Sequence, residues 1–123
     1  SLEGIAMLDR QRITQAIMNL AENATQYTQV GDTIAIGAAA RRGMLHLWVR
    51  DTGEGIAPQD QERIFNRFAR AANSRRRSEG AGLGLSIVKA IAHAHSGEIT
   101  VRSQLGQGST FAMKLPIKSP KES

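Results

Sequence analysis

Cysteine is absent from the 123-residue sequence, and aromatic residues make up only 4% of it. Without cysteine the chain can form neither a disulfide framework nor a thiolate metal site. No apolar run approaches the roughly 18 residues of a membrane-spanning helix, and no signal peptide is visible. Because the first residues read like the middle of a longer protein, we expect a domain excised from a larger parent.

The charged residues are unbalanced toward the basic side. Lys and Arg number 16 against 11 Asp and Glu, for a formal net charge of +5. Much of the excess lies in RFARAANSRRR, residues 67–77, which raises nucleic acid, a membrane surface or a phosphorylated ligand as partners. Most charge runs are solvated loops, however, and the basic residues are not interleaved with aromatic ones for base stacking. We therefore expect no nucleic-acid partner.

Apolar spacing predicts helices and strands in a single domain over residues 1–117, followed by a disordered tail at 118–123. Helices are expected over 10–27, with Asp9 as N-cap, over 58–68, and from the glycine-rich stretch at 80–86 to a Gly97 cap. Strands are expected over 33–39, 44–51 and 98–103, and within residues 106–116. Strands with one apolar face need helices on one side only. We therefore expect an α+β, two-layer α/β sandwich with a mixed, mostly antiparallel sheet.

Two asparagines four residues apart, Asn19 and Asn23, interrupt the first helix. Asn is a poor helix former, and this spacing places both side chains on nearly the same face. Their amide oxygens could serve Mg²⁺, which takes oxygen ligands and keeps several waters while it bridges phosphates. The simpler explanation of the pair alone is two polar residues on a solvated stripe.

Asp51 and a glycine-rich stretch offer further chemistry. Asp51 has the parity of a buried strand face, where a carboxylate needs a partner. It could accept a hydrogen bond from an exocyclic amine such as that of adenine, or simply begin a turn.

The stretch GAGLGLS, residues 80–86, opens a helix whose free N–H groups suit phosphate oxygens. It is not a Walker P-loop, because no Lys-Ser/Thr follows at the required spacing, and it follows no strand as a Rossmann turn does.

Five motifs in this order resemble the N, G1, F, G2 and G3 boxes of bacterial sensor histidine kinases. They are Asn19-x3-Asn23, DTGEGI at 51–56, IFNRF at 64–68, GAGLGLSIV at 80–88 and GQGSTF at 106–111. Over residues 9 to about 116 the chain is similar to the catalytic ATP-binding domain of these kinases, whose wider group includes gyrase, Hsp90 and MutL. The resemblance implies the Bergerat ATP-binding fold and MgATP as ligand, with an ATP lid over about residues 57–79.

The resemblance also implies roles for the matching residues. Asn23 is expected to bind Mg²⁺, and Asp51 to receive the adenine amine. Asn19 and Arg70 are the expected catalytic residues, Arg70 being at the lid base near the phosphates. The implied ATP-binding set is Asn19, Asn23, Gln26, Tyr27, Asp51, Gly53, Gly55, Ile56, Arg70, Gly80, Gly82, Leu83, Gly84, Leu85 and Ser109.

Two features depart from the pattern of relatives. Gln26 stands where many of them have Lys or Arg, and Arg75, Arg76 and Arg77 make the lid unusually basic. One of these arginines could compensate by closing on the γ-phosphate.

In gyrase-like relatives a glutamate that activates water matches Asn19. Because an amide cannot act as a general base, we expect slow ATP hydrolysis, unless Glu22 reaches the site.

The resemblance implies a protein-histidine kinase domain that donates the γ-phosphate of ATP to a histidine on a separate dimerisation domain, for passage to a response regulator. None of His46, His93 and His95 lies in an H-E-x-x-T-P-like context, so the acceptor is expected outside this chain. We expect a cytoplasmic, monomeric domain from a homodimeric parent in the cell membrane. The alternatives are an anti-sigma-type serine kinase, a degenerate ATP sensor of the same fold, and, less favoured, a basic nucleic-acid-binding module.

Overall fold

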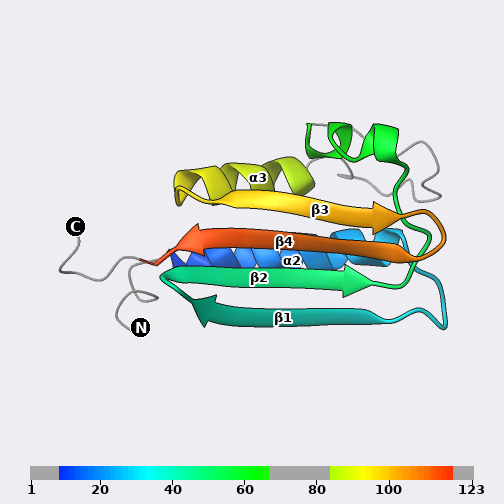
Figure 1. Cartoon of the computed structure of the whole chain (residues 1–123), viewed down its shortest axis with the longest axis horizontal. Helices are drawn as coiled ribbons and strands as arrows, with labels where there is room; N and C mark the ends of the chain where they lie inside the picture. Colours follow the sequence, from blue (N-terminus) through cyan, green and yellow to red (C-terminus); the bar gives the residue numbers. More distant parts are fainter. Residues whose placement is uncertain (1–8, 67–83, 118–123) are drawn as a thin grey trace.

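The computed structural model of the chain describes residues 9–66 and 84–117. Its elements follow one another along the sequence as shown in Figure 1. They are α2 (Arg10–Gln26), β1 (Ile34–Arg41), β2 (Met44–Asp51), the 3₁₀ turns η1 (Pro58–Asp60) and η2 (Arg63–Phe65), α3 (Gly84–Ala94), β3 (Glu98–Gln104) and β4 (Gly108–Pro116). None of the described helices is long and apolar enough to cross a membrane.

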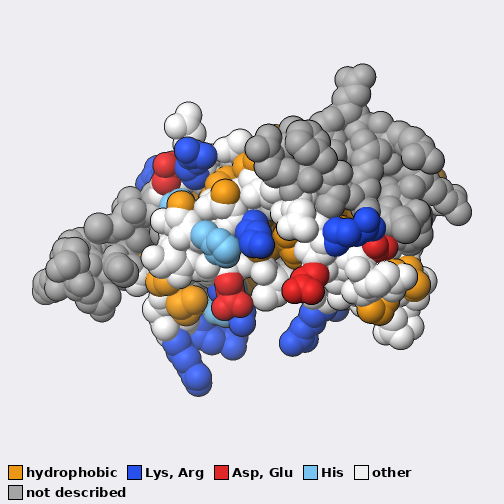
Figure 2. Space-filling view, turned by 90° about the horizontal axis from the view of Figure 1, so that it is seen from above, with side chains coloured by type: hydrophobic (Ala, Val, Ile, Leu, Met, Phe, Trp, Pro, Cys, Tyr) orange, Lys and Arg blue, Asp and Glu red, His pale blue; other side chains and the backbone are white. Residues whose placement is uncertain are grey.

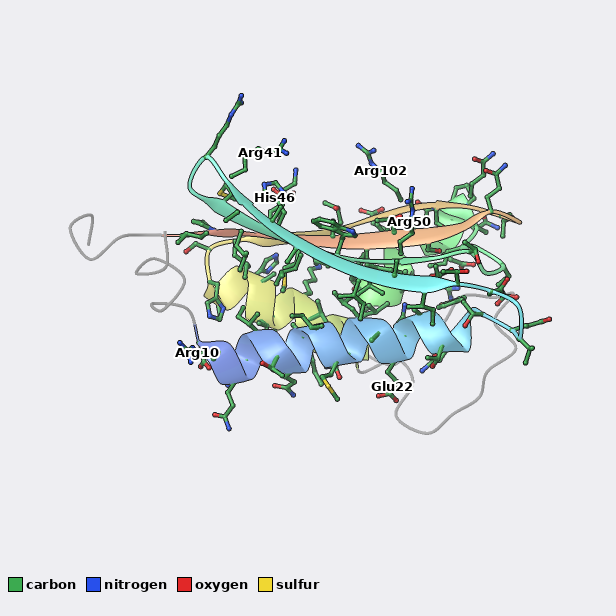
Figure 3. All side chains as sticks on the ribbon, turned by 90° about the horizontal axis from the view of Figure 1, so that it is seen from below. Arg10, Glu22, Arg41, His46, Arg50 and Arg102 are labelled. Atoms are coloured by element: carbon green, nitrogen blue, oxygen red, sulfur yellow. The ribbon has the colours of Figure 1, made fainter. Side chains whose placement is uncertain are left out.

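The four strands form one sheet in the order β1-β2-β4-β3. Each of the three described pairings is antiparallel. Helices α2 and α3 lie against the same face of the sheet, so that the other face is left open (Figure 3). The expected two-layer α/β sandwich is confirmed, and the strand order brings the end of β2 beside the start of β4.

Helix α2 forms where the apolar spacing predicted it. The Asp9 side chain caps its first turn by accepting a hydrogen bond from the Arg12 N–H at 3.1 Å. One face of the helix is buried against the sheet through Ala16, Leu20 and Ala24, which are at most 1% exposed. The helix ends one residue before the expected position, at Gln26.

The core lies between the helices and the covered face of the sheet. Every second residue of β4 points into it, and Phe111, Met113 and Leu115 are at most 1% exposed. Val49 of β2 also points into the core and is 1% exposed. The ring of Phe65 packs edge-on against that of Phe111, with centroids 6.1 Å apart. The alternation read from the sequence therefore assigns the inward positions of these strands correctly.

The expected helix over residues 58–68 is wrong within its described part. Two separate 3₁₀ turns take its place, and Asn66 is already extended. The Gln61 side-chain amide donates hydrogen bonds to the Ile56 carbonyl at 2.9 Å and to the Ser103 carbonyl at 3.1 Å, which tie this segment to the preceding loop and to β3. Tertiary contacts have outweighed the local preference for a helix. Phe68 lies outside the described residues.

The end of α3 also differs from expectation. Ser96, not Gly97, adopts the left-handed conformation, with φ of 61°. The N–H of Ser96 donates to the His93 carbonyl at 3.0 Å and that of Gly97 to the Ala92 carbonyl at 2.8 Å, the two bonds of a Schellman motif. Gly97 is needed for another reason, because a Cβ there would overlap the Lys114 carbonyl oxygen.

The first strand is displaced slightly from its expected range of 33–39. It begins at Ile34 and continues to Arg41. As expected, Ile34 and Ile36 share a face, but they are 38% and 58% exposed at the edge of the sheet.

Candidate functional site

Three polar side chains lie side by side across the covered face of the sheet. Asp51 on β2 is the register partner of Ser109 on β4, which is the partner of Ser103 on β3. Residues directly opposite each other project to the same face. Asp51 and Ser109 are only 2% and 3% exposed. A polar row is therefore built into an otherwise apolar layer, at the end of the sheet where β2 stops.

The Asp51 carboxylate is only half satisfied. Its Oδ1 accepts a hydrogen bond from the Gly53 N–H at 2.9 Å, whereas its Oδ2 is buried and has no partner among the described residues. Burial raises the pKa of Asp51, the backbone N–H groups of Gly53 and Ser109 oppose that rise, and the charge of Asp32 adds to it. A buried oxygen without a donor is costly, and it is available to accept a hydrogen bond from a ligand.

Glycines allow the loop after β2 to pass very close to its neighbours. A Cβ on Gly53 would overlap the Tyr27 carbonyl oxygen, and one on Gly55, with φ of +77°, would overlap the Gln104 carbonyl oxygen. The loop is held by the Glu54 N–H, which donates to the Tyr27 carbonyl at 2.9 Å. These glycines are thus required by the backbone itself, whatever they contribute to a ligand pocket.

A serine pair supports the same loop from β3 and β4. The Ile56 N–H donates to Ser103 Oγ at 2.7 Å, and that oxygen lies 2.8 Å from Ser109 Oγ. Ser109 was expected at the site, whereas the sequence argument missed Ser103. The available signal was its parity with the inward-facing Ile99 and Val101, which places a hydroxyl on the covered face.

The two asparagines of α2 differ in burial, and Asn19 lies beside the start of α3. Asn23 is 9% exposed and Asn19 is half-buried. The Asn19 Cβ lies 3.8 Å from where a Cβ on Gly84 would stand. Both Nδ2 atoms are buried without a partner among the described residues. Each amide therefore has unused hydrogen-bonding capacity, and its nearly isosteric oxygen can be presented by a turn about the last side-chain bond.

Glu22 is exposed and points away from the sheet (Figure 3). The described structure thus places an amide, and not a carboxylate, beside the start of α3.

The remaining expected site residues on described segments are one half-buried polar residue and three residues of the hydrophobic core. Gln26 is half-buried at the last residue of α2. Tyr27, Ile56 and Leu85 belong to the hydrophobic core, with exposed fractions of 6%, 0% and 6%. Their side chains hold α2, the loop after β2 and α3 together, so they form the apolar wall behind the polar groups. The other expected residues, Arg70, Gly80, Gly82 and Leu83, and the arginines at 75–77, lie outside the described residues.

No group of three or more His, Asp or Glu side chains that could hold a metal ion occurs within residues 9–66 and 84–117. A cation at Asn23 would accordingly need oxygens from a bound ligand and from water. That requirement suits Mg²⁺, which usually keeps several waters and substrate phosphates in its coordination shell.

Comparisons with known proteins show the family and the fold of the chain. Histidine protein kinase DivJ of Caulobacter vibrioides is 39% identical over 109 residues, covering 89% of this chain and 18% of DivJ. The mycobacterial sensor histidine kinase MprB has a similar structure, with a TM-score of 0.80, 29% identity, and coverage of 92% of this chain and 77% of that chain. Full-length ShkA in complex with AMPPNP gives a TM-score of 0.74 at 36% identity, over 88% of this chain and 22% of that chain.

The chain therefore spans less than one fifth of the length of DivJ. The family model of histidine kinase-, DNA gyrase B- and HSP90-like ATPases matches residues 8–119, nearly the whole chain. The protein belongs to this ATPase family.

Proposed function

We propose that this domain binds MgATP and presents its γ-phosphate to a histidine on a separate dimerisation domain, in the autophosphorylation of a sensor histidine kinase. The observation that carries the proposal is the buried, unpartnered Oδ2 of Asp51. The membership of the ATPase family and the AMPPNP bound to ShkA support a nucleotide as the donor of the missing hydrogen bond.

In the proposed complex the exocyclic amine of adenine donates to Asp51 Oδ2. The Gly53 N–H keeps the other carboxylate oxygen fixed, so that the acceptor is oriented before the base arrives. Ser109, beside Asp51, adds a hydroxyl to the same wall. This contact would select a base that carries an amine over one that carries a carbonyl at the same position. The carbonyl oxygen would face the carboxylate oxygen with no proton between them.

At the other end of the nucleotide, Asn23 supplies a metal ligand and Asn19 lies beside the start of α3. Mg²⁺, when bound, would neutralise phosphate charge and help to align the γ-phosphoryl group. Asn19 cannot take a proton from water, and Glu22 points away from the sheet. The site should hence hold ATP with little hydrolysis until a protein acceptor arrives. Arg70 and one of the arginines at positions 75–77 are proposed to contact the phosphates.

A phosphotransfer assay tests this function. The chain is mixed with the separately produced histidine-bearing domain of its parent and with γ-labelled ATP. We expect acid-labile label on the partner and none on this chain alone. If the chain binds ATP but transfers no label, the domain is an ATP sensor and not a kinase. Acid-stable label on a serine would instead support the anti-sigma-type alternative.

The names of the relatives favour the histidine kinase. By the same analogy we propose that the parent is a homodimer in the cell membrane, with a response regulator as the later phosphate acceptor.

A further inference from the structure

The face of the sheet that α2 and α3 leave open carries the alternate residues of each strand. On β2 these are His46, Trp48 and Arg50, which point away from the core. Figure 3 shows His46 and Arg50 together with Arg41 and Arg102 on the side of the sheet opposite the helices. The candidate nucleotide site lies on the other face, so it makes no use of these side chains.

Positive charge dominates this open face. Arg41, Arg50, Arg102 and Lys114 project from it, whereas Glu98, the register partner of Lys114, is the one carboxylate at its described positions. The ion pair between Arg63 and Asp60 lies elsewhere, in the two 3₁₀ turns. Lys and Arg side chains accordingly extend from the lower side of the molecule in Figure 2. Among the described residues, four cations against one carboxylate give the face a net positive charge.

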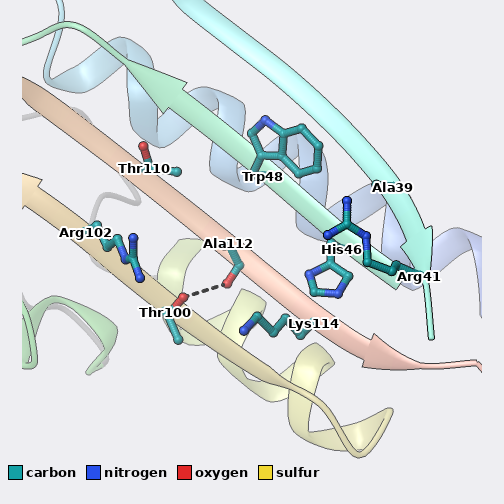
Figure 4. Close-up of a pocket in the computed structure, with 9 residues that line it drawn as sticks. All are labelled: Ala39, Arg41, His46, Trp48, Thr100, Arg102, Thr110, Ala112 and Lys114. Carbon is teal, nitrogen blue, oxygen red and sulfur yellow. Dashed lines mark hydrogen bonds between the residues drawn. The ribbon is translucent and has the colours of Figure 1, made fainter. Parts of the chain in front are cut away.

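The same face is hollowed around an aromatic ring. The depression has a volume of about 370 Å³ and is bordered by residues of all four strands (Figure 4). Small residues, Ala39 and Ala112, lower its floor beside Trp48. The indole lies over Gly37, where a Cβ would overlap the ring. The cationic members of its border are Arg41, Arg102 and Lys114.

An apolar hollow with an indole in its floor and cations around it fits a protein interface. Trp and Arg are enriched among the residues that carry most of the energy of protein–protein binding. Uncompensated charge around such a centre selects partners of opposite charge and speeds their association. Nucleic acid fits less well, because single-strand binding uses a series of stacking aromatics, and Trp48 is the only tryptophan in the chain.

We propose that the open face of the sheet docks an acidic protein surface, with an apolar side chain of that partner filling the hollow over Trp48. Carboxylates of the partner pair with Arg102 and Lys114 on one side of the hollow and with Arg41 on the other, as their positions in Figure 4 allow. Docking on this face leaves the Asp51 side chain accessible to nucleotide, because Asp51 belongs to the opposite face.

Trp48 itself reports on the interaction, since a single tryptophan provides all of the indole fluorescence. The probe is a synthetic helical peptide with glutamates and leucines along one stripe, and its control has every glutamate replaced by glutamine. We expect the acidic peptide to change the Trp48 emission saturably, and salt to weaken the binding. The glutamine peptide should bind at least about 10-fold more weakly.

Charge reversal locates the interaction on the molecule. The double variant Arg102→Glu/Lys114→Glu should weaken binding of the acidic peptide by about 10-fold or more, since the partner's carboxylates then meet like charges. The matched double variant Arg10→Glu/Arg12→Glu changes the net charge equally on exposed positions of α2, and should alter binding by less than about 3-fold. Circular dichroism and an ATP titration establish that each variant is folded.

Three results would overturn the proposal. The first is no saturable change of Trp48 fluorescence with the acidic peptide. The second is equal weakening by the two double variants, which would reduce the effect to overall charge. The third is tighter binding of a single-stranded oligonucleotide than of the peptide, abolished by the same charge reversals, which would make the face a nucleic-acid site.

Discussion

Asn19 of α2 lies against Gly84, the first described residue of α3. The Asn19 Cβ and Cγ are 3.8 and 4.0 Å from the position that a Cβ on Gly84 would occupy. Two residues more than sixty positions apart in the sequence thus meet in space, one offering an amide and the other the start of a helix. Under the proposed function, a phosphate held at the start of α3 would lie beside the side chain at position 19.

Asn19→Glu is expected to turn the domain toward ATP hydrolysis. A carboxylate at this position can take a proton from an attacking water, which the amide cannot, and general-base catalysis contributes about 10²–10⁴-fold. We expect phosphate release in the absence of an acceptor to rise by about 10-fold or more. Asn19→Gln, which lengthens the side chain equally but adds no base, is the control. Equal rates for the two variants would show that position 19 does not face the attacking water.

Gly108→Ala should lower the free energy of unfolding of the domain and distort the candidate site. Gly108 has φ of +107°, and a Cβ there would overlap the Asp51 carbonyl oxygen. We expect a loss of about 3–4 kcal/mol in the free energy of unfolding, measured by urea denaturation. Gly106→Ala is the matched control, because Gly106 has φ of +83° with open space around it. That change should cost only about 1–2 kcal/mol, and similar losses for both would refute the steric argument.

Ser103→Ala is expected to destabilise the loop after β2. It removes the acceptor of the Ile56 N–H and the hydroxyl partner of Ser109. A buried group left unsatisfied costs about 1–3 kcal/mol, which should appear as a lower free energy of unfolding. Thr100→Val removes an exposed hydroxyl of the same strand, whose hydrogen bond is 3.4 Å long, and should cost less than about 0.5 kcal/mol. A Ser103→Ala loss no larger than that of the control would contradict this role.

The raised pKa of Asp51 predicts a pH-dependent effect of Asp51→Asn on stability. Burial lifts the pKa above the ordinary 3.8, so the native state holds this proton more tightly than the unfolded chain. Stability is hence lost as the pH rises from 3.8 through the raised pKa. Because the asparagine variant does not titrate, its stability relative to the wild type should improve across that window and then level off. Urea denaturation of both proteins at a series of pH values checks this, and a constant or shrinking difference would contradict it.

Much of the fold could be predicted because its signals are periodic. The strict alternation in β2 assigns the buried positions Leu47 and Val49, and the same parity predicts that Asp51 is buried. The helix-like pattern at 58–68 failed, since it holds no information about the hydrogen bonds from Gln61 to the Ile56 and Ser103 carbonyls. A tertiary bond between distant segments leaves no mark in local spacing.

For the candidate site, the sequence predicted which residues lie together better than it predicted why each of them is needed. Asp51 and Ser109 were expected together, and they are register partners. Gly53 was expected to make room for a base, yet the structure shows that the Tyr27 carbonyl already excludes a Cβ there. Such close approaches of two backbones depend on the path of the loop, which the sequence alone does not specify.

Calorimetric titration of ATP and Mg²⁺ into the wild type, Asp51→Asn and Asp32→Asn tests the central claim most directly. Asp32 is an exposed carboxylate whose charge is felt at Asp51, so its variant makes the same charge change without touching the proposed acceptor. We predict that the wild type and Asp32→Asn bind ATP, and that Asp51→Asn weakens binding by about 10- to 100-fold, the loss of one hydrogen bond to a charged group. Unchanged affinity of a folded Asp51→Asn domain would contradict the assignment of Asp51 as the acceptor of the adenine amine.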